Sequence, residues 1–155
     1  MAAEPKIVQK GAFLVAGTRY EGKNEHGEVP AIWDNEFLPR IDELTSLRVG
    51  SEVYGVARGL PNAAPGVFEY LAGVTVKSLV NLPAGMVGWE IPAQTYAVLP
   101  AHDVPDIMPV INYYYQEWLP RSKEFTSAQG AFLELYPETY PQDLIIYLHF
   151  PVRRK

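Results

Sequence analysis

The sequence carries one five-residue pattern twice, and this internal repeat limits the folds that the chain can adopt. The pattern is Glu-aromatic-Leu-Pro-Arg, found at residues 36–40 and 117–121, which lie 81 positions apart. Each copy lies in a segment whose apolar residues recur near helical spacing, residues 30–44 and 105–119. An internal repeat of this kind indicates that one structural unit is built twice.

Strand-like segments accompany both predicted helices in the same order. The corresponding segments are residues 13–20 and 96–103, residues 53–57 and 132–136, and residues 69–76 and 144–152. The sequence therefore predicts two βαββ units, over about residues 6–77 and 88–152, within a single domain covering residues 1–155.

These elements predict an α+β fold in which an antiparallel sheet carries two helices on one face. The other face of such a sheet is free to line a ligand cleft. Pro39 lies inside the first helical pattern and is expected to kink or break it. Residues 6–19 are predicted as one strand, and a strand over residues 89–99 is expected to be interrupted near Pro92.

Composition excludes several classes of protein. The 155 residues are 48% hydrophobic and 20% charged, with a net charge of −5 and no cysteine. The only basic run is residues 153–155, so direct binding to nucleic acid is not expected. The sequence shows no signal-peptide pattern and no apolar stretch of about 18 residues, so we expect a cytoplasmic protein that does not bind membranes.

The sequence shows no motif for a metal, a cofactor or a known catalytic constellation. The three histidines, His26, His102 and His149, do not have the spacing of metal ligands. There is no Gly-x-Ser-x-Gly elbow and no glycine-rich phosphate loop. We therefore predict no metal site, no cofactor and no catalytic residue.

One strand-like segment places a carboxylate among aromatic residues. In FLELYPETY, residues 132–140, alternation puts Leu133 and Leu135 on one face and Phe132, Glu134 and Tyr136 on the other. We expect the leucines to face the helices and the second set to face the cleft. A carboxylate there would lose hydration, which makes its charge costly unless a cation compensates it.

Five segments in order resemble one known family, the GyrI-like small-molecule-binding domain, also called the AraC-type bacterial effector-binding domain. They are FEYLAGVTV at 68–76, PAGMVGWEIPAQTYAVLPAH at 83–102, YYYQEWLPRS at 113–122, FLELYPE at 132–138 and LIIYLHFPVRR at 144–154. The resemblance implies a tandem βαββ repeat with a central cleft, in agreement with the internal repeat.

The resemblance also implies a function. Family members serve as sensor domains of multidrug-responsive regulators or as separate binding proteins, and a glutamate in the strand after the second helix pairs with lipophilic cations. By motif, that residue is Glu134. Regulators attach a helix-turn-helix domain, for which 155 residues leave no room. The sequence is therefore similar to the stand-alone, cationic-drug-binding proteins of integron gene cassettes, and a regulator protein is a candidate partner.

Aromatic residues are the candidate walls of the cleft, because their rings attract cations. The predicted ligand-binding residues are Glu134, Tyr147, Phe132, Tyr136, Tyr70, Trp89, Tyr114 and Trp118. Sequence alone does not separate aromatic residues of the cleft from those of the core.

Two other functions stay open at this point. In some family members the equivalent glutamate is associated with hydrolysis of cyclopropanoid compounds, so Glu134 could act as a base or nucleophile with Tyr147 as its helper. The chain could instead be a module that binds a protein partner. Our preferred hypothesis is the binding of hydrophobic organic cations without catalysis.

Overall fold

The computed structural model describes residues 4–155. The first three residues of the domain predicted over residues 1–155 lie outside the described part of the chain. The strands are β1 (Lys6–Lys10), β2 (Phe13–Gly22), β3 (Arg48–Gly59), β4 (Phe68–Val76), β5 (Val87–Ile91), β6 (Gln94–His102), β7 (Phe125–Ser127), β8 (Phe132–Tyr136) and β9 (Ile145–Arg154). Within residues 4–155 no helix is long and apolar enough to cross a bilayer.

Two helical segments accompany these strands. The first consists of α1 (Glu28–Ile32), a π-helical part η1 (Trp33–Phe37) and a 3₁₀ part η2 (Leu38–Leu44). The second consists of η3 (Val104–Asp106), α2 (Ile107–Tyr113), a π-helical part η4 (Tyr114–Trp118) and α3 (Leu119–Arg121).

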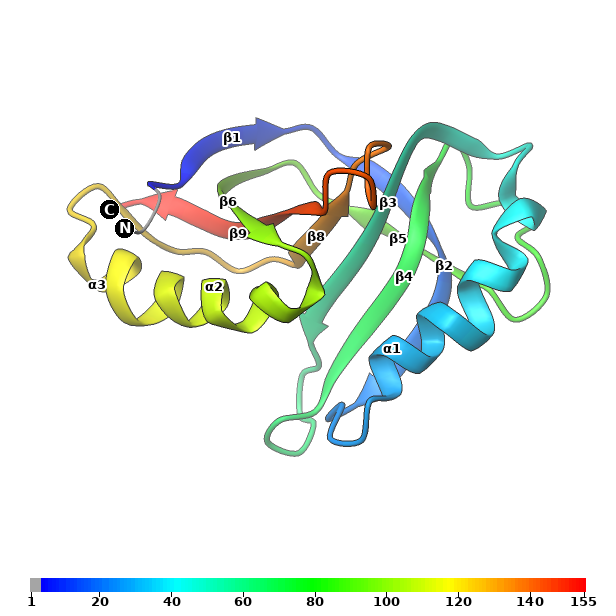
Figure 1. The fold of residues 1–155 in the computed structure, drawn as a ribbon, viewed down its shortest axis with the longest axis horizontal. Helices are drawn as coiled ribbons and strands as arrows, with labels where there is room; N and C mark the ends of the chain where they lie inside the picture. The colour runs from blue at the N-terminus through cyan, green and yellow to red at the C-terminus, as the bar shows by residue number, and fades with distance from the viewer. Residues whose placement is uncertain (1–3) are drawn as a thin grey trace.

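The strands form an antiparallel sheet in the order β1-β6-β9-β8-β3-β4-β2-β5, with β7 added to β9. The first helical segment packs on β2 and β4, and the second packs on β6 and β9. Both segments lie on the same face of the curled sheet and diverge from each other (Figure 1). The central strands β3 and β8 therefore run between the two helices.

The α+β class and the antiparallel sheet with two helices on one face are confirmed. The interruption near Pro92 is also confirmed, since β5 ends at Ile91 and β6 begins at Gln94. The segment predicted as one strand over residues 6–19 forms two strands. β1 ends at Lys10 and pairs with β6, whereas β2 pairs with β4 and β5. The short strand β7 has no counterpart in the prediction.

Both helical segments change their hydrogen bonding at the repeated sequence pattern. The π-helical parts begin at Trp33 and at Tyr114, which are separated by the same 81 positions as the pattern. Each is followed by a Leu-Pro pair, and the nitrogen of Pro39 or Pro120 has no hydrogen to donate to the preceding turn. A π-helical turn is an ordinary way to accommodate such a missing bond. The irregularity expected at Pro39 therefore occurs in both segments.

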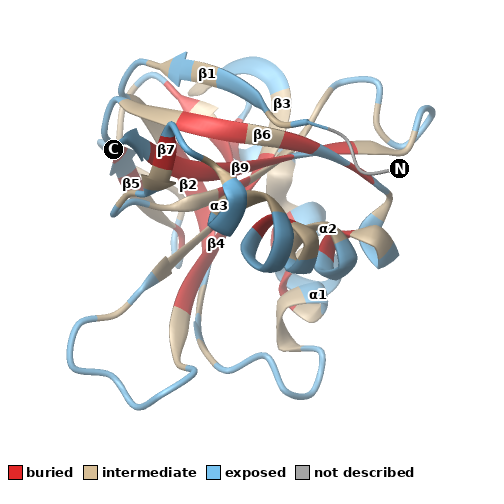
Figure 2. Ribbon diagram, turned by 90° about the vertical axis from the view of Figure 1, so that its left-hand side faces the viewer, coloured by how far each residue is buried: buried red, intermediate tan, exposed pale blue. Residues whose placement is uncertain are grey.

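The core has three parts. Two of them lie under the helical segments, and the third lies on the opposite face, where Val56, Leu71 and Leu133 are fully buried. Figure 2 shows that the buried residues concentrate in strands such as β4, β6 and β9. Leu133 thus faces away from the helices, contrary to our expectation, and its neighbour Glu134 lies on the helix-bearing face.

Candidate functional site

Glu134 lies at the middle of β8 and accepts hydrogen bonds from two tyrosines. The Tyr70 hydroxyl donates to Glu134 Oε1 at 2.6 Å, and the Tyr136 hydroxyl donates to the same oxygen at 3.3 Å. Trp33 Nε1 in turn donates to the Tyr70 hydroxyl oxygen at 3.0 Å. The site thus joins side chains from η1, β4 and β8, which are brought together only by the fold.

Gly55 makes the contact between Tyr70 and Glu134 possible. On β3 it pairs with Glu134 on one side and with Ala72 on the other, so β3 separates β4 from β8. A Cβ atom added at Gly55 would lie 2.0 Å from the Tyr70 hydroxyl oxygen and 2.4 Å from Glu134 Oε1. The phenol therefore crosses β3 through the space that the missing side chain leaves.

Aromatic rings surround the carboxylate on the side of the first helical segment. The Trp33 ring contacts the Tyr136 ring at 5.4 Å between centroids and the Tyr70 ring at 6.4 Å, both edge to face. Tyr136 also packs against Tyr140 at 5.2 Å, and the Tyr140 hydroxyl donates to Asp103 Oδ1 at 2.7 Å. A continuous aromatic wall thus leads from Trp33 to the loop before α2.

The electrostatics of the site leave a negative charge without an internal counter-ion. Loss of hydration raises the pKa of Glu134, and the hydrogen bonds from Tyr70 and Tyr136 oppose this shift. None of the ion pairs among residues 4–155 involves Glu134. Burial also raises the pKa values of Tyr70 and Tyr136, so both are neutral phenols that donate their protons. The arrangement can attract a cation that approaches the half-buried carboxylate.

Five of the remaining predicted residues share the helix-bearing face with Glu134 in different ways. Tyr70 and Tyr136 contact its carboxylate, and Phe132 is the next residue of β8 on the same face. Tyr114 instead belongs to the core under α2, where its ring stacks on Phe150 at 3.9 Å. Trp118 stacks on Tyr114, and its Nε1 donates to Glu4 at 3.1 Å.

Two predicted residues lie on the opposite face, and the expectation that they share a cleft with Glu134 is wrong. On β9 it is Leu148 that pairs with Glu134, so Tyr147 points to the other side of the sheet. Trp89 pairs with Val15 on that same far side and is 7% exposed. The error came from expecting Glu134 on the face without helices: Leu148 and Phe150 do belong to the core under the second helical segment, and Glu134 shares their face.

Sequence reasoning missed Trp33 and Gly55. Trp33 lies 81 positions before Tyr114, so the repeat interval applied to a predicted site residue would have found it. Gly55 gives no such signal, because a glycine in a strand can mark a bulge, a bend or a close approach.

A hollow adjoins the site on the same face. It has a volume of about 270 Å³ and lies between η4 and the ends of β3, β4 and β8. Its lining includes Ala57, Phe68, Tyr115, Phe132 and Pro151. Larger hollows occur elsewhere, near the chain ends and beside β5. Neither these nor the hollow at Phe132 are lined by Glu134 or its tyrosine partners, but Phe132 is the neighbour of Glu134 on the same face of β8.

Comparison with curated proteins shows one clear relative. The chain is 36% identical to the transcriptional regulator BrlR of Pseudomonas aeruginosa over 93 residues, which are 60% of this chain and 33% of BrlR. The similar region thus corresponds to about a third of the length of that regulator.

Solved structures share the fold at low sequence identity. SAV2435, in a structure bound to tetraphenylphosphonium, has a TM-score of 0.76 at 18% identity, with 97% of this chain and 94% of that chain covered. The integron cassette protein VCH_CASS2 of Vibrio cholerae has a TM-score of 0.65 at 16% identity, covering 98% and 97% of the two chains. The C-terminal domain of EcmrR has a TM-score of 0.71 at 11% identity, with both chains fully covered.

The family model for Cass2, the integron-associated effector-binding protein, matches residues 6–152, which is nearly the whole chain. This match confirms the resemblance to effector-binding proteins, and the solved structures share the fold. The chain belongs to the family of integron-associated effector-binding proteins.

Proposed function

We propose that this protein binds lipophilic organic cations and that Glu134 is their counter-ion. The observation that supports this most directly is the environment of Glu134, a carboxylate among aromatic rings that has hydrogen-bond donors but no ion-pair partner within residues 4–155. The structure of the similar protein SAV2435 bound to tetraphenylphosphonium, a lipophilic cation, agrees with this choice of ligand class.

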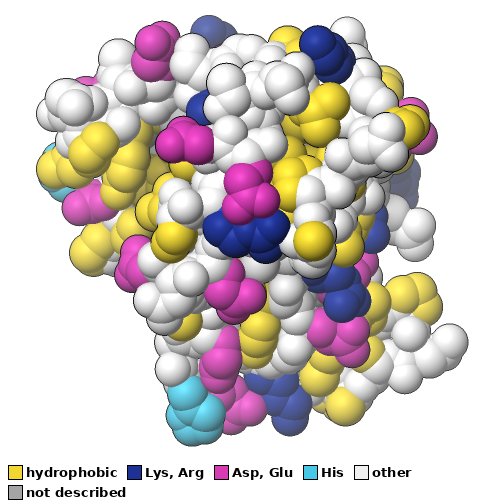
Figure 3. All heavy atoms as spheres, turned by 90° about the vertical axis from the view of Figure 1, so that its right-hand side faces the viewer, with side chains coloured by type: hydrophobic (Ala, Val, Ile, Leu, Met, Phe, Trp, Pro, Cys, Tyr) yellow, Lys and Arg dark blue, Asp and Glu magenta, His cyan; other side chains and the backbone are white. Residues whose placement is uncertain are grey.

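The physical basis of the selectivity is local. A partly desolvated carboxylate recovers electrostatic stabilisation when a cation approaches, and the faces of Trp33, Tyr70 and Tyr136 each add about 0.5–2 kcal/mol of cation–π attraction where they contact the guest. Acidic and basic side chains are interspersed over the α1 side of the molecule (Figure 3). We therefore assign cation selectivity to Glu134 rather than to the overall charge of −5.

Replacing the carboxylate by its neutral isostere tests this proposal. Titration calorimetry with tetraphenylphosphonium is expected to show that Glu134→Gln weakens binding by more than about tenfold, which corresponds to about 1.4 kcal/mol. Binding of triphenylphosphine oxide, a neutral aromatic of similar shape, is expected to change little. Equal losses for the charged and the neutral compound would contradict the counter-ion role.

Hydrolysis of cyclopropanoid or electrophilic compounds stays a prediction, with one change of residue. Tyr147 cannot help Glu134 from the opposite face of the sheet, whereas the Tyr70 hydroxyl lies 2.6 Å from the carboxylate. Turnover assays with cyclopropanoid substrates separate the two functions, because a binding protein consumes none. A regulator protein as partner and a cytoplasmic location also stay predictions.

A further inference from the structure

The hollow beside the site continues the same row of side chains that surrounds Glu134. Phe132 is two residues from Glu134 on β8, and Ala57 is two residues from Gly55 on β3, so both pairs point to the same face. Two residues of a strand span about 7 Å, which is the length of a fused or linked ring system. A ligand held at Glu134 is therefore close enough to extend into the hollow.

The hollow is suited to flat apolar groups. Its floor is low because Ala57 and Gly59 carry little or no side chain, and its walls include the rings of Phe68, Tyr115 and Phe132. Its volume of about 270 Å³ exceeds the roughly 150 Å³ of a cavity that accommodates benzene. Tyr115 is 49% exposed, so an apolar group placed beside it would cover surface that now faces water.

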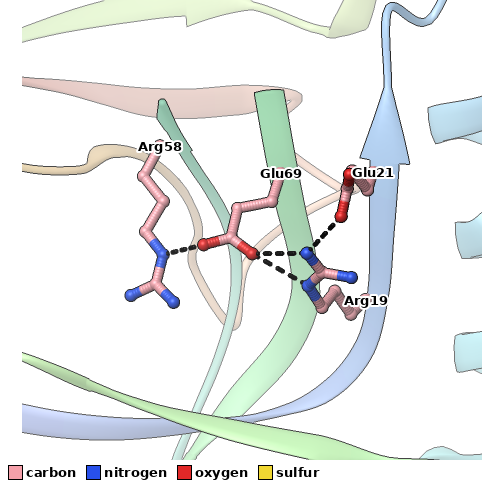
Figure 4. Close-up of polar contacts among 4 residues, drawn as sticks. All are labelled: Arg19, Glu21, Arg58 and Glu69. Carbon is pink, nitrogen blue, oxygen red and sulfur yellow. Dashed lines mark hydrogen bonds and ion pairs between the residues drawn. The ribbon is translucent and has the colours of Figure 1, made fainter. Parts of the chain in front are cut away.

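No charged group in the hollow's lining could compensate a second cation. Arg58 is the one charged residue of the lining, and its guanidinium is directed to the opposite face of the sheet. There it lies 3.7 Å from the centre of the Trp89 ring. It also donates a hydrogen bond to Glu69, as Figure 4 shows. A second positive charge at this end of a ligand would lose hydration without gaining a counter-ion.

From this arrangement we infer that the ligands are monocations with an uncharged, flat aromatic arm, and that the arm occupies the hollow between Ala57, Phe132 and Tyr115. This inference rests on the proposed function, because Glu134 holds the cationic end. The hollow then determines which cations bind well, by the length of the arm and by the absence of charge at its far end.

Three quaternary ammonium probes test the inference by titration calorimetry on the full chain. Benzyltrimethylammonium has a short arm, biphenyl-4-ylmethyl-trimethylammonium has a long arm, and biphenyl-4,4′-bis(methyl-trimethylammonium) has a second charge at the end of the long arm. The long-arm monocation is expected to bind about tenfold tighter than the short one, because burial of the added ring removes more apolar surface from water. The dication is expected to bind at least about threefold more weakly than the long-arm monocation.

Two variants alter the hollow without changing the residues that contact Glu134. Gly59→Leu fills the floor at a position where an added Cβ meets no atom within 4 Å, and Tyr115→Ala removes an exposed wall. Each is expected to reduce the ratio between long-arm and short-arm affinity to below about threefold, with short-arm affinity unchanged within about twofold. An unchanged ratio in both variants, or a dication that binds as tightly as the long-arm monocation, would overturn the inference.

Glu134→Gln separates this inference from the proposed function. If that variant weakens both monocations while the ratio responds to neither hollow variant, cation binding stands and the arm site is wrong. If Glu134→Gln leaves the affinity of every probe unchanged, or if the long-arm monocation does not bind wild-type protein, the proposed function fails together with the inference.

Discussion

Glu69 and Glu134 are carboxylates on opposite faces of the same sheet, and they differ in what compensates their charge. Glu69 is 6% exposed, and it accepts hydrogen bonds from Arg58 and from Arg19 Nε at 2.8 Å (Figure 4). Glu134 is more accessible, yet its donors are neutral phenols. The exposure of the whole residue therefore does not distinguish the proposed binding carboxylate from the one that is paired within the protein.

The two sites shift their carboxylate pKa values in opposite directions. Burial acts to raise the pKa of Glu69, but the hydrogen bonds and charges of Arg58 and Arg19 outweigh it, and the pKa lies below its ordinary value. Burial also acts to raise the pKa of Glu134. Its neutral tyrosine partners donate hydrogen bonds but supply no positive charge, so they do not offset this rise. The first carboxylate is satisfied within the protein, and the second is available to a cationic guest.

The largest expected difference between the two sites is in folding stability. Glu69→Gln leaves Arg58 and Arg19 without their shared carboxylate and is expected to lower the free energy of unfolding by about 1–3 kcal/mol. The partial exposure of both arginines keeps this value below the 3–5 kcal/mol of a fully buried pair. Glu134→Gln is expected to change stability by less than about 0.5 kcal/mol, or to raise it. Urea denaturation at pH 7 measures both, and the reverse order would contradict the comparison.

A smaller effect is expected when the path between Tyr70 and Glu134 is blocked. Gly55→Ala places a methyl group where the phenol crosses β3, and we expect a loss of about 1–2 kcal/mol in unfolding free energy and weaker binding of tetraphenylphosphonium. The matched control for the stability measurement is Gly59→Ala on the same strand, where an added Cβ meets no atom within 4 Å. Alanine normally suits a strand at least as well as glycine, so the control is expected to be neutral or slightly stabilising. Equal effects of the two substitutions would show that Gly55 has no special role.

The same comparison shows what the sequence could predict. The internal repeat was enough to predict the fold class, and the alternation of residues 132–136 together with the family resemblance selected Glu134. The partners of Glu134 depend on strand register and on the relative position of the helices. The sequence therefore placed Glu134 on the face without helices and grouped it with Tyr147, whereas the fold places it on the same face as Leu148.

Trp33 and Gly55 illustrate the remaining gap. The helical spacing of Trp33 indicates a core residue, and only its bond to Tyr70 places it at the site. The role of Gly55 depends on three adjacent strands that are distant in sequence. The pairing of Glu69 was also not predictable. Nothing in the segment FEYLAGVTV indicates that this carboxylate pairs with two arginines and does not bind a ligand.

The most subtle expected difference is in the dependence on pH. A carboxylate with a raised folded pKa holds its proton more tightly in the folded protein, so Glu134 lowers stability as the pH rises from its unfolded pKa to its folded pKa. Glu69 has the opposite sign: its contribution is present above the unfolded pKa and is lost as the pH falls through the lowered folded pKa. If the proposed function holds, the cation binds the ionised form of Glu134, so affinity for tetraphenylphosphonium is expected to fall about twofold as the pH is lowered from 8 to the raised pKa of this residue, and more steeply below that pKa. Calorimetric titrations across this range should show the fall in wild-type protein and in Glu69→Gln, whereas Glu134→Gln should give a flat profile. A pH dependence that persists in Glu134→Gln would assign the titrating group elsewhere and would remove the proposed distinction between the two carboxylates.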